Sequence, residues 1–192
     1  MDYKGAEQQV KNVLKHYGIL GMKWGVHKDR SNTVFVSGSS KTQDKTSGYY
    51  RRKLNKDIRN ELNKSMKNKD RIVVGDAPGI DRQVQDYLKK KKYKNVEVYG
   101  PGTKVRYSAN KKWKTNPIDA PEYEVGSKEW LAKKDIMMTK VSDIGLAIIL
   151  DEGAKATRKN VQRLIEQNKD VKVYELSSYG KKYDRFVDKN TV

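Results

Sequence analysis

From residue 31 onward, short apolar runs alternate with segments in which apolar residues recur every three or four positions. The runs have the length of buried strands, and the intervening segments have the period of amphipathic helices. This alternation is typical of βαβ units, in which parallel strands form one sheet covered by helices on both faces. The pattern therefore predicts a three-layer α/β domain over residues 31–177. Its mainly parallel sheet has five predicted strands, at 34–37, 71–75, 95–99, 146–150 and 171–176.

Four helices are predicted between these strands, each from a stripe of apolar residues that we assign to core packing. The stripes comprise Tyr50, Leu54, Ile58, Leu62 and Met66; Ile80, Val84, Tyr87 and Leu88; Trp130, Leu131, Met137, Met138 and Val141; and Val161, Leu164 and Ile165. Residues 100–126 break the alternation with three prolines and several lysines, and we predict a long loop that acts as a lid or specificity element. Residues 1–30 are predicted to be a helical and loop appendage, and residues 178–192 a polar tail.

Charge and composition restrict the partners of the chain. Lys and Arg number 42 against 24 Asp and Glu, and the net charge of +18 favours polyanions, including non-specific binding of DNA. The absence of cysteine excludes disulfides, thiolate zinc sites and cysteine nucleophiles, and with two histidines we expect neither a metal nor another cofactor. No apolar stretch approaches a membrane span, and the N-terminus lacks a signal-peptide core. We expect a soluble, intracellular protein with no membrane partner.

Three junctions rich in small residues follow predicted strands, at 36–41, 73–81 and 151–158. The carboxyl ends of parallel strands share one edge of the sheet, where ligands bind near the point at which strand order reverses. Backbone amides at the start of the helix after residue 79 would bind a phosphate or another anion. A tight strand-to-helix turn also needs glycine for structural reasons alone, and the two interpretations stay open. The candidate ligand-binding residues are Gly38, Ser39, Lys41, Gly75, Ala77, Gly79, Arg82, Lys134, Gly153 and Thr157.

Carboxylates near this edge are the candidates for hydrolytic chemistry. Asp76, Asp81 and Asp151 could orient water or stabilise an oxocarbenium-like centre. Aspartates at strand ends are also common helix caps, which is the alternative role for each. The chain has neither the G-x-G-x-x-G fingerprint of dinucleotide-binding proteins nor the G-x-x-x-x-G-K-[ST] P-loop, which disfavours standard dehydrogenases and nucleoside triphosphatases.

Residues 32–177 resemble the SLOG superfamily of Rossmann-like domains, and within it the small YspA-like branch. The turn Gly75-Asp76-Ala77-Pro78-Gly79-Ile80-Asp81 is similar to the glycine-rich turn after the family's second strand. Lys134-Asp135-Ile136-Met137-Met138 resembles its Arg-Asn-x-x-Met element, and Gly153-Ala154-Lys155-Ala156-Thr157 its Gly-Ser-Lys-Gly-Thr element.

The resemblance implies a Rossmann-like domain that binds a nucleotide or a nucleotide derivative. Some members cleave the N-glycosidic bond, and some relatives form homodimers. This chain departs from the family at Lys134 and Ala156 and lacks the Pro-Gly-Gly-x-Gly-Thr-x-x-Glu pattern of the phosphoribohydrolases. Whether it is an enzyme therefore stays open. A sponge for a nucleotide immune signal would have the same pocket.

A second resemblance covers residues 16–27, which are similar to the H-x-G-x-x-G-M-K-W-G peptide of tailed-phage head-associated proteins. It implies a phage-encoded protein located in the virion head or the host cytoplasm. The apolar side chains of Ile19, Leu20, Met22 and Trp24 need a surface to bury against, which is either a phage head protein or the chain's own domain. The alternative function is a non-enzymatic virion cargo protein that holds packaged DNA through its charge.

Overall fold

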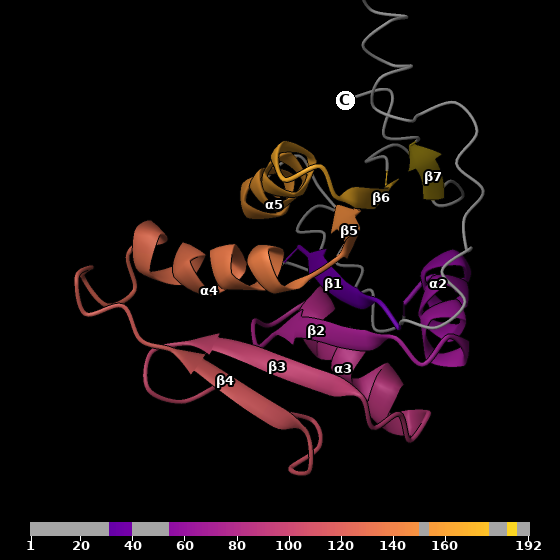
Figure 1. The fold of residues 1–192 in the computed structure, drawn as a ribbon, viewed down its shortest axis with the longest axis horizontal. Helices are drawn as coiled ribbons and strands as arrows, with labels where there is room; N and C mark the ends of the chain where they lie inside the picture. The colour runs from indigo at the N-terminus through magenta and orange to yellow at the C-terminus, as the bar shows by residue number, and fades with distance from the viewer. Residues whose placement is uncertain (1–30, 40–53, 150–153, 177–183, 188–192) are drawn as a thin grey trace, which may run out of the picture. The chain divides into compact units, whose positions relative to one another are not determined.

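The computed structural model describes residues 31–39, 54–149, 154–176 and 184–187. Within them one twisted sheet has the strand order β4-β3-β2-β1-β5-β6-β7 (Figure 1). Six strands are parallel, and only β7 is antiparallel to its neighbour β6. The strands are β1 (Thr33–Gly38), β2 (Arg71–Gly75), β3 (Val96–Pro101), β4 (Lys114–Ile118), β5 (Ile144–Ile149), β6 (Asp170–Leu176) and β7 (Asp184–Val187).

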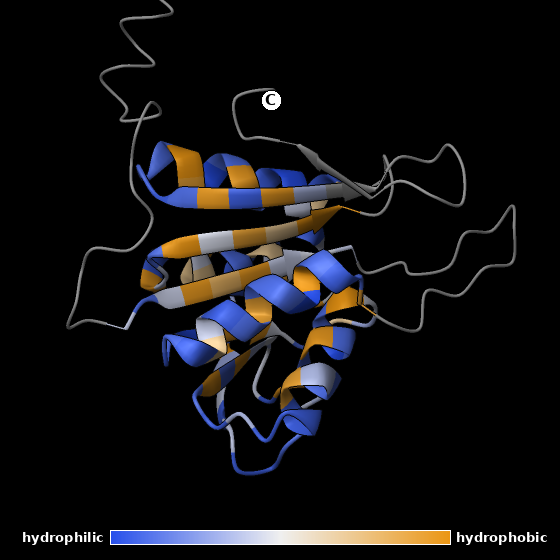
Figure 2. Ribbon diagram, turned by 90° about the vertical axis from the view of Figure 1, so that its right-hand side faces the viewer, coloured by the Kyte–Doolittle hydropathy of each residue, from blue (hydrophilic) through white to orange (hydrophobic). Residues whose placement is uncertain are grey.

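Four described helices cover the two faces of this sheet. Helices α2 (Lys56–Lys67) and α3 (Ile80–Lys90) bury Ile58, Leu62, Val84 and Leu88 against one face. Helices α4 (Lys128–Val141) and α5 (Lys155–Glu166) cover the other face with side chains that include Met138 and Leu164. Figure 2 shows the hydrophobic positions concentrated on the strands, while the helices alternate between hydrophobic and hydrophilic residues. The predicted α/β class with a mainly parallel sheet is confirmed.

The five predicted strands coincide with β1, β2, β3, β5 and β6, but the predicted number of strands is too small. β4 lies inside the stretch 100–126 that was predicted to be a loop, and β7 lies inside the predicted polar tail. β4 has the sequence Lys-Thr-Asn-Pro-Ile and is largely exposed at the edge of the sheet, so it lacks the apolar pattern of a buried strand. Trp113, just before β4, is only 4% exposed and belongs to the core.

Most described residues of the helical stripes are core positions. Trp130 is only partly buried and belongs to neither core cluster. Leu131 and Ile165 are 37% and 47% exposed, so their assignment to the core was wrong. On α4 the buried residues are Lys134, Met138 and Thr139, which shows that this helix turns a partly polar face toward the sheet. Tyr50 lies outside the described residues. None of the described helices has the length and apolar character needed to cross a lipid bilayer.

Three helices end in the same way, with a residue that has a positive φ angle just beyond the C-cap. These residues are Lys69 (φ 61°), Lys92 (φ 56°) and Asn168 (φ 55°). After α3, the amide of Lys92 donates to the Lys89 carbonyl at 2.9 Å and the amide of Tyr93 donates to the Leu88 carbonyl at 3.0 Å. This is the Schellman motif, in which glycine is the favoured residue at the position of Lys92.

We expect Lys92→Gly to stabilise the domain by about 0.5–1 kcal/mol, because glycine adopts a positive φ without the steric cost that a Cβ imposes. The matched control is Lys90→Gly, two residues earlier and inside α3. There glycine should destabilise by about 0.5–1 kcal/mol, since it loses helix propensity. Urea unfolding of both variants measures the two changes, and changes of the same sign would contradict this description of the helix end.

Candidate functional site

The sheet reverses its strand order at β1, which pairs with β2 on one side and with β5 on the other. In open α/β sheets the crevice at such a switch point, outside the carboxyl ends of the strands, is where ligands bind. Gly38 ends β1 and Gly75 ends β2, while Thr157 lies in the first turn of α5, just after β5. The structure therefore brings the described parts of the three predicted junctions to one edge. Residues 40–53 and 150–153 are not described.

A cluster of buried charged and polar side chains lies along this carboxyl edge. Asp76, Asp81 and Lys134 are 1%, 6% and 6% exposed. The Lys134 Nζ atom pairs with Asp135 Oδ1 at 2.5 Å. Asn160 on α5 continues the network, because its Nδ2 atom donates to Asp135 Oδ2 at 3.2 Å and to Ser37 Oγ at 3.0 Å. We call these six residues the carboxyl-edge cluster, and they come from β1, the β2–α3 turn and helices α3, α4 and α5.

Gly75 leaves space above the end of β2 that the side chains of Asp81 and Lys134 occupy. A Cβ atom at residue 75 would lie 2.2 Å from Asp81 Oδ2 and 3.1 Å from Lys134 Nζ. Asp81 Oδ2 also accepts a hydrogen bond from the amide of Ala77 at 3.3 Å. A side chain at residue 75 would displace these groups, so glycine is needed here for close packing.

The electrostatics of the cluster centre on Asp81. The pKa of Asp81 is raised to about 7, chiefly by burial and to a smaller extent by Asp135 and Asp76, against the opposing effects of the Lys134 charge and the hydrogen bond from the Ala77 amide. Burial alone would lower the pKa of Lys134, but Asp135 and Asp81 outweigh burial and hold this pKa above its usual value. Near neutral pH, Asp81 therefore exchanges a proton readily while Lys134 keeps its charge.

The buried side chains of Asp76 and Gln85 hold the segment after β3 against the β2–α3 turn through hydrogen bonds. The Asp76 carboxylate accepts hydrogen bonds from the Arg106 amide at 2.7 Å, from its Nε atom at 3.1 Å and from its Nη2 atom at 2.5 Å. Gln85 donates to the Gly75 carbonyl at 2.8 Å and accepts from the Ala109 amide at 2.9 Å. Residues 106–109 are thus held against the turn through their backbone as well as their side chains.

The amides predicted to bind an anion are partly used within the protein. Gly79, with a φ of 90°, is the N-cap of α3. The Ala77 amide donates to Asp81, and the Ile80 amide donates to the Ser39 carbonyl at 3.1 Å. These two donors already have acceptors within the protein, so they are not free to bind an anion in this structure.

The other predicted site residues are more scattered. Arg82 is exposed and stacks over the Tyr107 ring at 4.4 Å, on the outer side of α3. Thr157 is buried at 2% exposure in the first turn of α5. The predictions for Lys41, Asp151 and Gly153, and those for Ile19, Leu20, Met22 and Trp24 in the docking peptide, fall on residues that are not described.

The sequence-based prediction missed Ser37, Arg106, Asp135 and Asn160. Asn160 had a detectable signal, because it lies on the same helical stripe as Thr157, Val161 and Leu164 and is a polar residue at a core position. Asp135 directly follows Lys134 in the motif that marked the latter. Arg106 lies in an irregular segment, where no periodic pattern identifies a partner for Asp76.

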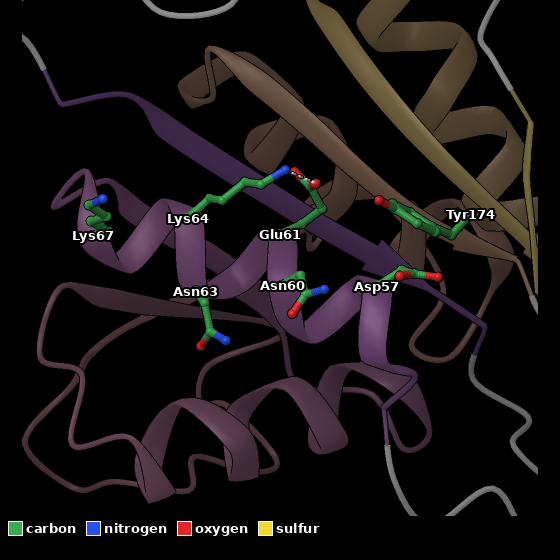
Figure 3. Close-up of a pocket in the computed structure, with 7 residues that line it drawn as sticks. All are labelled: Asp57, Asn60, Glu61, Asn63, Lys64, Lys67 and Tyr174. Atoms are coloured by element: carbon green, nitrogen blue, oxygen red, sulfur yellow. Dashed lines mark hydrogen bonds and ion pairs between the residues drawn. The ribbon is translucent and has the colours of Figure 1, made fainter.

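A separate groove lies on α2, away from the cluster. It has a volume of about 570 Å³ and is lined by Asp57, Asn60, Glu61, Asn63, Lys64, Lys67 and Tyr174 (Figure 3). Glu61 is paired with Lys64 at 2.8 Å and with Lys172 at 2.7 Å. Burial, together with Glu61 and Asp57, raises the pKa of Tyr174 to about 12. The groove contains no residue that was predicted for the site.

Comparison with known proteins gives one match. A model of a family of unknown function, DUF7211, matches residues 7–31, a stretch that includes the predicted docking peptide. No curated protein and no solved structure matches the chain. Among the described residues, no group of three or more histidine, cysteine, aspartate or glutamate side chains is arranged to hold a metal ion.

Proposed function

We propose that this protein binds a nucleotide or a nucleotide-derived molecule at the carboxyl edge of its sheet. The observation that supports the proposal is the carboxyl-edge cluster, in which charged and polar side chains from five elements are buried next to the switch point. Ligand sites in open α/β sheets occur at this place in the fold.

Stability alone is a poor explanation for such a cluster. Removing charges from water costs several kcal/mol for each ion, and apolar residues of similar volume are often at least as stabilising. Here Asp76, Asp81 and Asp135 face Lys134 and Arg106, so among the described residues the carboxylates outnumber the cations. Strongly shifted pKa values cluster at functional sites, and Asp81 is a buried carboxyl group with such a shift.

The chemistry of the cluster suits a ligand with both hydrogen-bond donors and acceptors. Asn160 is already bound to Ser37, Asp135 and Arg163, so it orders the cluster and leaves ligand contacts to the other side chains. The Ser37 hydroxyl can donate as well as accept, Lys134 offers a cation, and Asp81 can accept or donate near neutral pH. The hydroxyls of a ribose and the edges of a base need such partners. The resemblance of residues 32–177 to SLOG domains supports the same class of ligand.

Binding is better supported than hydrolysis. Asp76 is engaged with three donors of Arg106, and Asp81 is buried and accepts from Ala77, so neither carboxylate is free to position a water molecule. N-glycosidic hydrolysis requires a carboxylate beside the scissile bond. We therefore propose a binding protein, with turnover as a possible addition that the third candidate, Asp151, would have to supply.

Isothermal titration with nucleoside mono- and diphosphates tests this proposal on the full chain. We expect Asp135→Asn to weaken nucleotide binding by about tenfold or more, because it removes the charge that holds Lys134 and changes the partner of Asn160. The control is Glu97→Gln, which removes a buried carboxylate of the same sheet that is paired with Arg71 and Lys114. Equal losses in both variants, or no binding by the wild type, would refute the proposal.

The predicted association with a phage head is a separate proposal. Its support is the resemblance of residues 16–27 to the peptide of tailed-phage head-associated proteins. The family match over residues 7–31 contains this peptide but is to a family of unknown function. Deletion of residues 1–30 should then abolish incorporation into particles while the α/β domain still binds its nucleotide. Incorporation that survives the deletion would contradict this proposal.

A further inference from the structure

The edge of the sheet opposite the cluster carries many lysines. β2, β3 and β4 are adjacent and parallel, so the residues just before them lie together at the amino edge. Helices α2 and α3 lead into β2 and β3 and therefore end at the same edge. Residues 67–69 span the end of α2 and the start of its connection to β2, residues 89–94 span the end of α3 and its connection to β3, and residues 111–112 precede β4. We call these three stretches the lysine edge.

Hydrogen bonds join the three stretches to one another. Asn95 Nδ2 donates to the Lys69 carbonyl at 3.1 Å, and the Tyr93 hydroxyl donates to the Asp70 carbonyl at 2.5 Å. Trp113 Nε1 donates to the Tyr93 carbonyl at 2.9 Å. The lysine edge is therefore one connected surface with a defined backbone.

The charge of this surface has a single sign. The lysine edge contains nine lysines and no acidic residue, and all nine are exposed. The acidic neighbours Asp70 and Glu97 are only 3% and 8% exposed. Among the described residues, none of the nine lysines forms an ion pair. Such a concentration of positive charge attracts a polyanion.

We infer that the lysine edge binds the phosphate backbone of duplex nucleic acid without sequence preference. Lysine ammonium groups neutralise phosphates as point charges, and this contact carries no information about the bases. Within the described residues, α2 and α3 have their C-terminal ends at this edge, so neither presents a helix N-terminus to a DNA groove. This inference is independent of the proposed nucleotide site, which lies at the other end of the strands.

Other polyanionic partners fit this surface less well. The exposed large apolar side chains among the described residues are Tyr123, Val125, Leu131 and Ile165, and none lies at the lysine edge, which leaves nothing to insert into a membrane. Protein interfaces are depleted of lysine and enriched in arginine and aromatic residues, so a protein partner also fits the lysine edge less well than nucleic acid does.

A single strand is also a poorer fit than a duplex. Its binding relies on aromatic rings that are free to stack with bases. Trp113 is buried, and the Tyr87 and Tyr93 hydroxyls are bound to Asn63 and to the Asp70 carbonyl, which fixes these rings against the core.

The test is binding of a fluorescent duplex DNA to the full chain, measured by anisotropy over a range of salt concentrations. If about five phosphates are neutralised, log K should fall against log salt with a slope of roughly −4.5. The triple variant Lys89→Gln, Lys91→Gln and Lys94→Gln should reduce this slope by about 2–3. A control with the same change in net charge, Lys128→Gln, Lys155→Gln and Lys159→Gln, alters exposed lysines of α4 and α5 and should leave the slope near that of the wild type.

Equal effects of the two triple variants would overturn the inference, because they would show a general charge effect without a defined surface. Tighter binding of single-stranded DNA, or of vesicles with anionic lipids, would overturn it as well. Circular dichroism serves as the control that shows whether both variants are folded. Binding of a nucleoside phosphate to the variant with Lys89, Lys91 and Lys94 replaced should be unchanged, which separates this result from that for the carboxyl-edge cluster.

Discussion

Replacing Lys134 with alanine is expected to lower the free energy of unfolding by about 3–5 kcal/mol, the usual cost of removing one partner from a buried ion pair. Lys134 is 6% exposed, and its ammonium group is the cation that pairs with Asp135 and faces Asp81. Without it, Arg106 would be the cation that the described residues leave close to these carboxylates. Alanine is the best helix former, so the loss would not come from helix propensity.

The control for this variant is Lys140→Ala, in the same helix but at an exposed position. Its effect on the free energy of unfolding should be within about 0.5 kcal/mol. Urea unfolding at neutral pH measures both. If Lys134→Ala were as mild as the control, the cluster would have to be more hydrated than its burial indicates, and the argument from buried charge would fail.

Asp81→Asn should change the pH dependence of stability. The folded-state pKa of Asp81, about 7, lies above its unfolded value, so from roughly pH 4 to 7 the folded wild type binds a proton that the unfolded chain has released. The contribution of Asp81 to stability is therefore fully present below about pH 4 and is lost as the pH rises to 7. The asparagine side chain does not titrate, so it makes no such pH-dependent contribution. The stability of the variant relative to the wild type should rise by up to about 1.4 kcal/mol per pH unit over this range and level off above it.

Comparing the variant with the wild type at each pH separates the contribution of Asp81 to stability from the contributions of the other acidic residues. Side-chain hydrogen bonds and nearby cations hold the pKa values of Glu61 and Glu97 below their usual value despite burial, so their contributions are lost at lower pH, equally in both proteins. Chemical denaturation between pH 4 and pH 9 provides the data. A difference that is constant with pH, or that falls as the pH rises, would show that Asp81 is ionised throughout.

The parallel core of the fold could be predicted because buried strands have continuous apolar runs. Ile72-Val73-Val74 and the run from Leu146 to Ile149 are buried on both faces of the sheet and contain almost no polar residue. β4 could not be found in this way. Its position is set by backbone pairing with β3 in a register such as Val98 with Thr115, and its exposed side chains are free to be polar.

The sequence predicted those parts of the candidate site that are consecutive in the chain. It did not predict the contacts between residues that are far apart in the sequence. The turn from Gly75 to Asp81 has a local sequence signal, since its residues are consecutive. The contact between Asn160 and Ser37 joins residues 123 positions apart, and it depends on how α5 packs over β1. No single-sequence pattern specifies such a pairing, although a polar residue on the buried stripe of a helix indicates that some partner exists.

The central claim is that the carboxyl-edge cluster binds a nucleotide-derived molecule. The most direct measurement is mass spectrometry of the small molecules released from the purified full chain, made in parallel on Asp135→Asn and Glu97→Gln. The account predicts that a nucleotide or a nucleotide derivative is recovered from the wild type and from Glu97→Gln and is largely lost from Asp135→Asn. Recovery of no such molecule, together with no heat on titration with nucleoside phosphates, would contradict it, and so would equal recovery from the two variants.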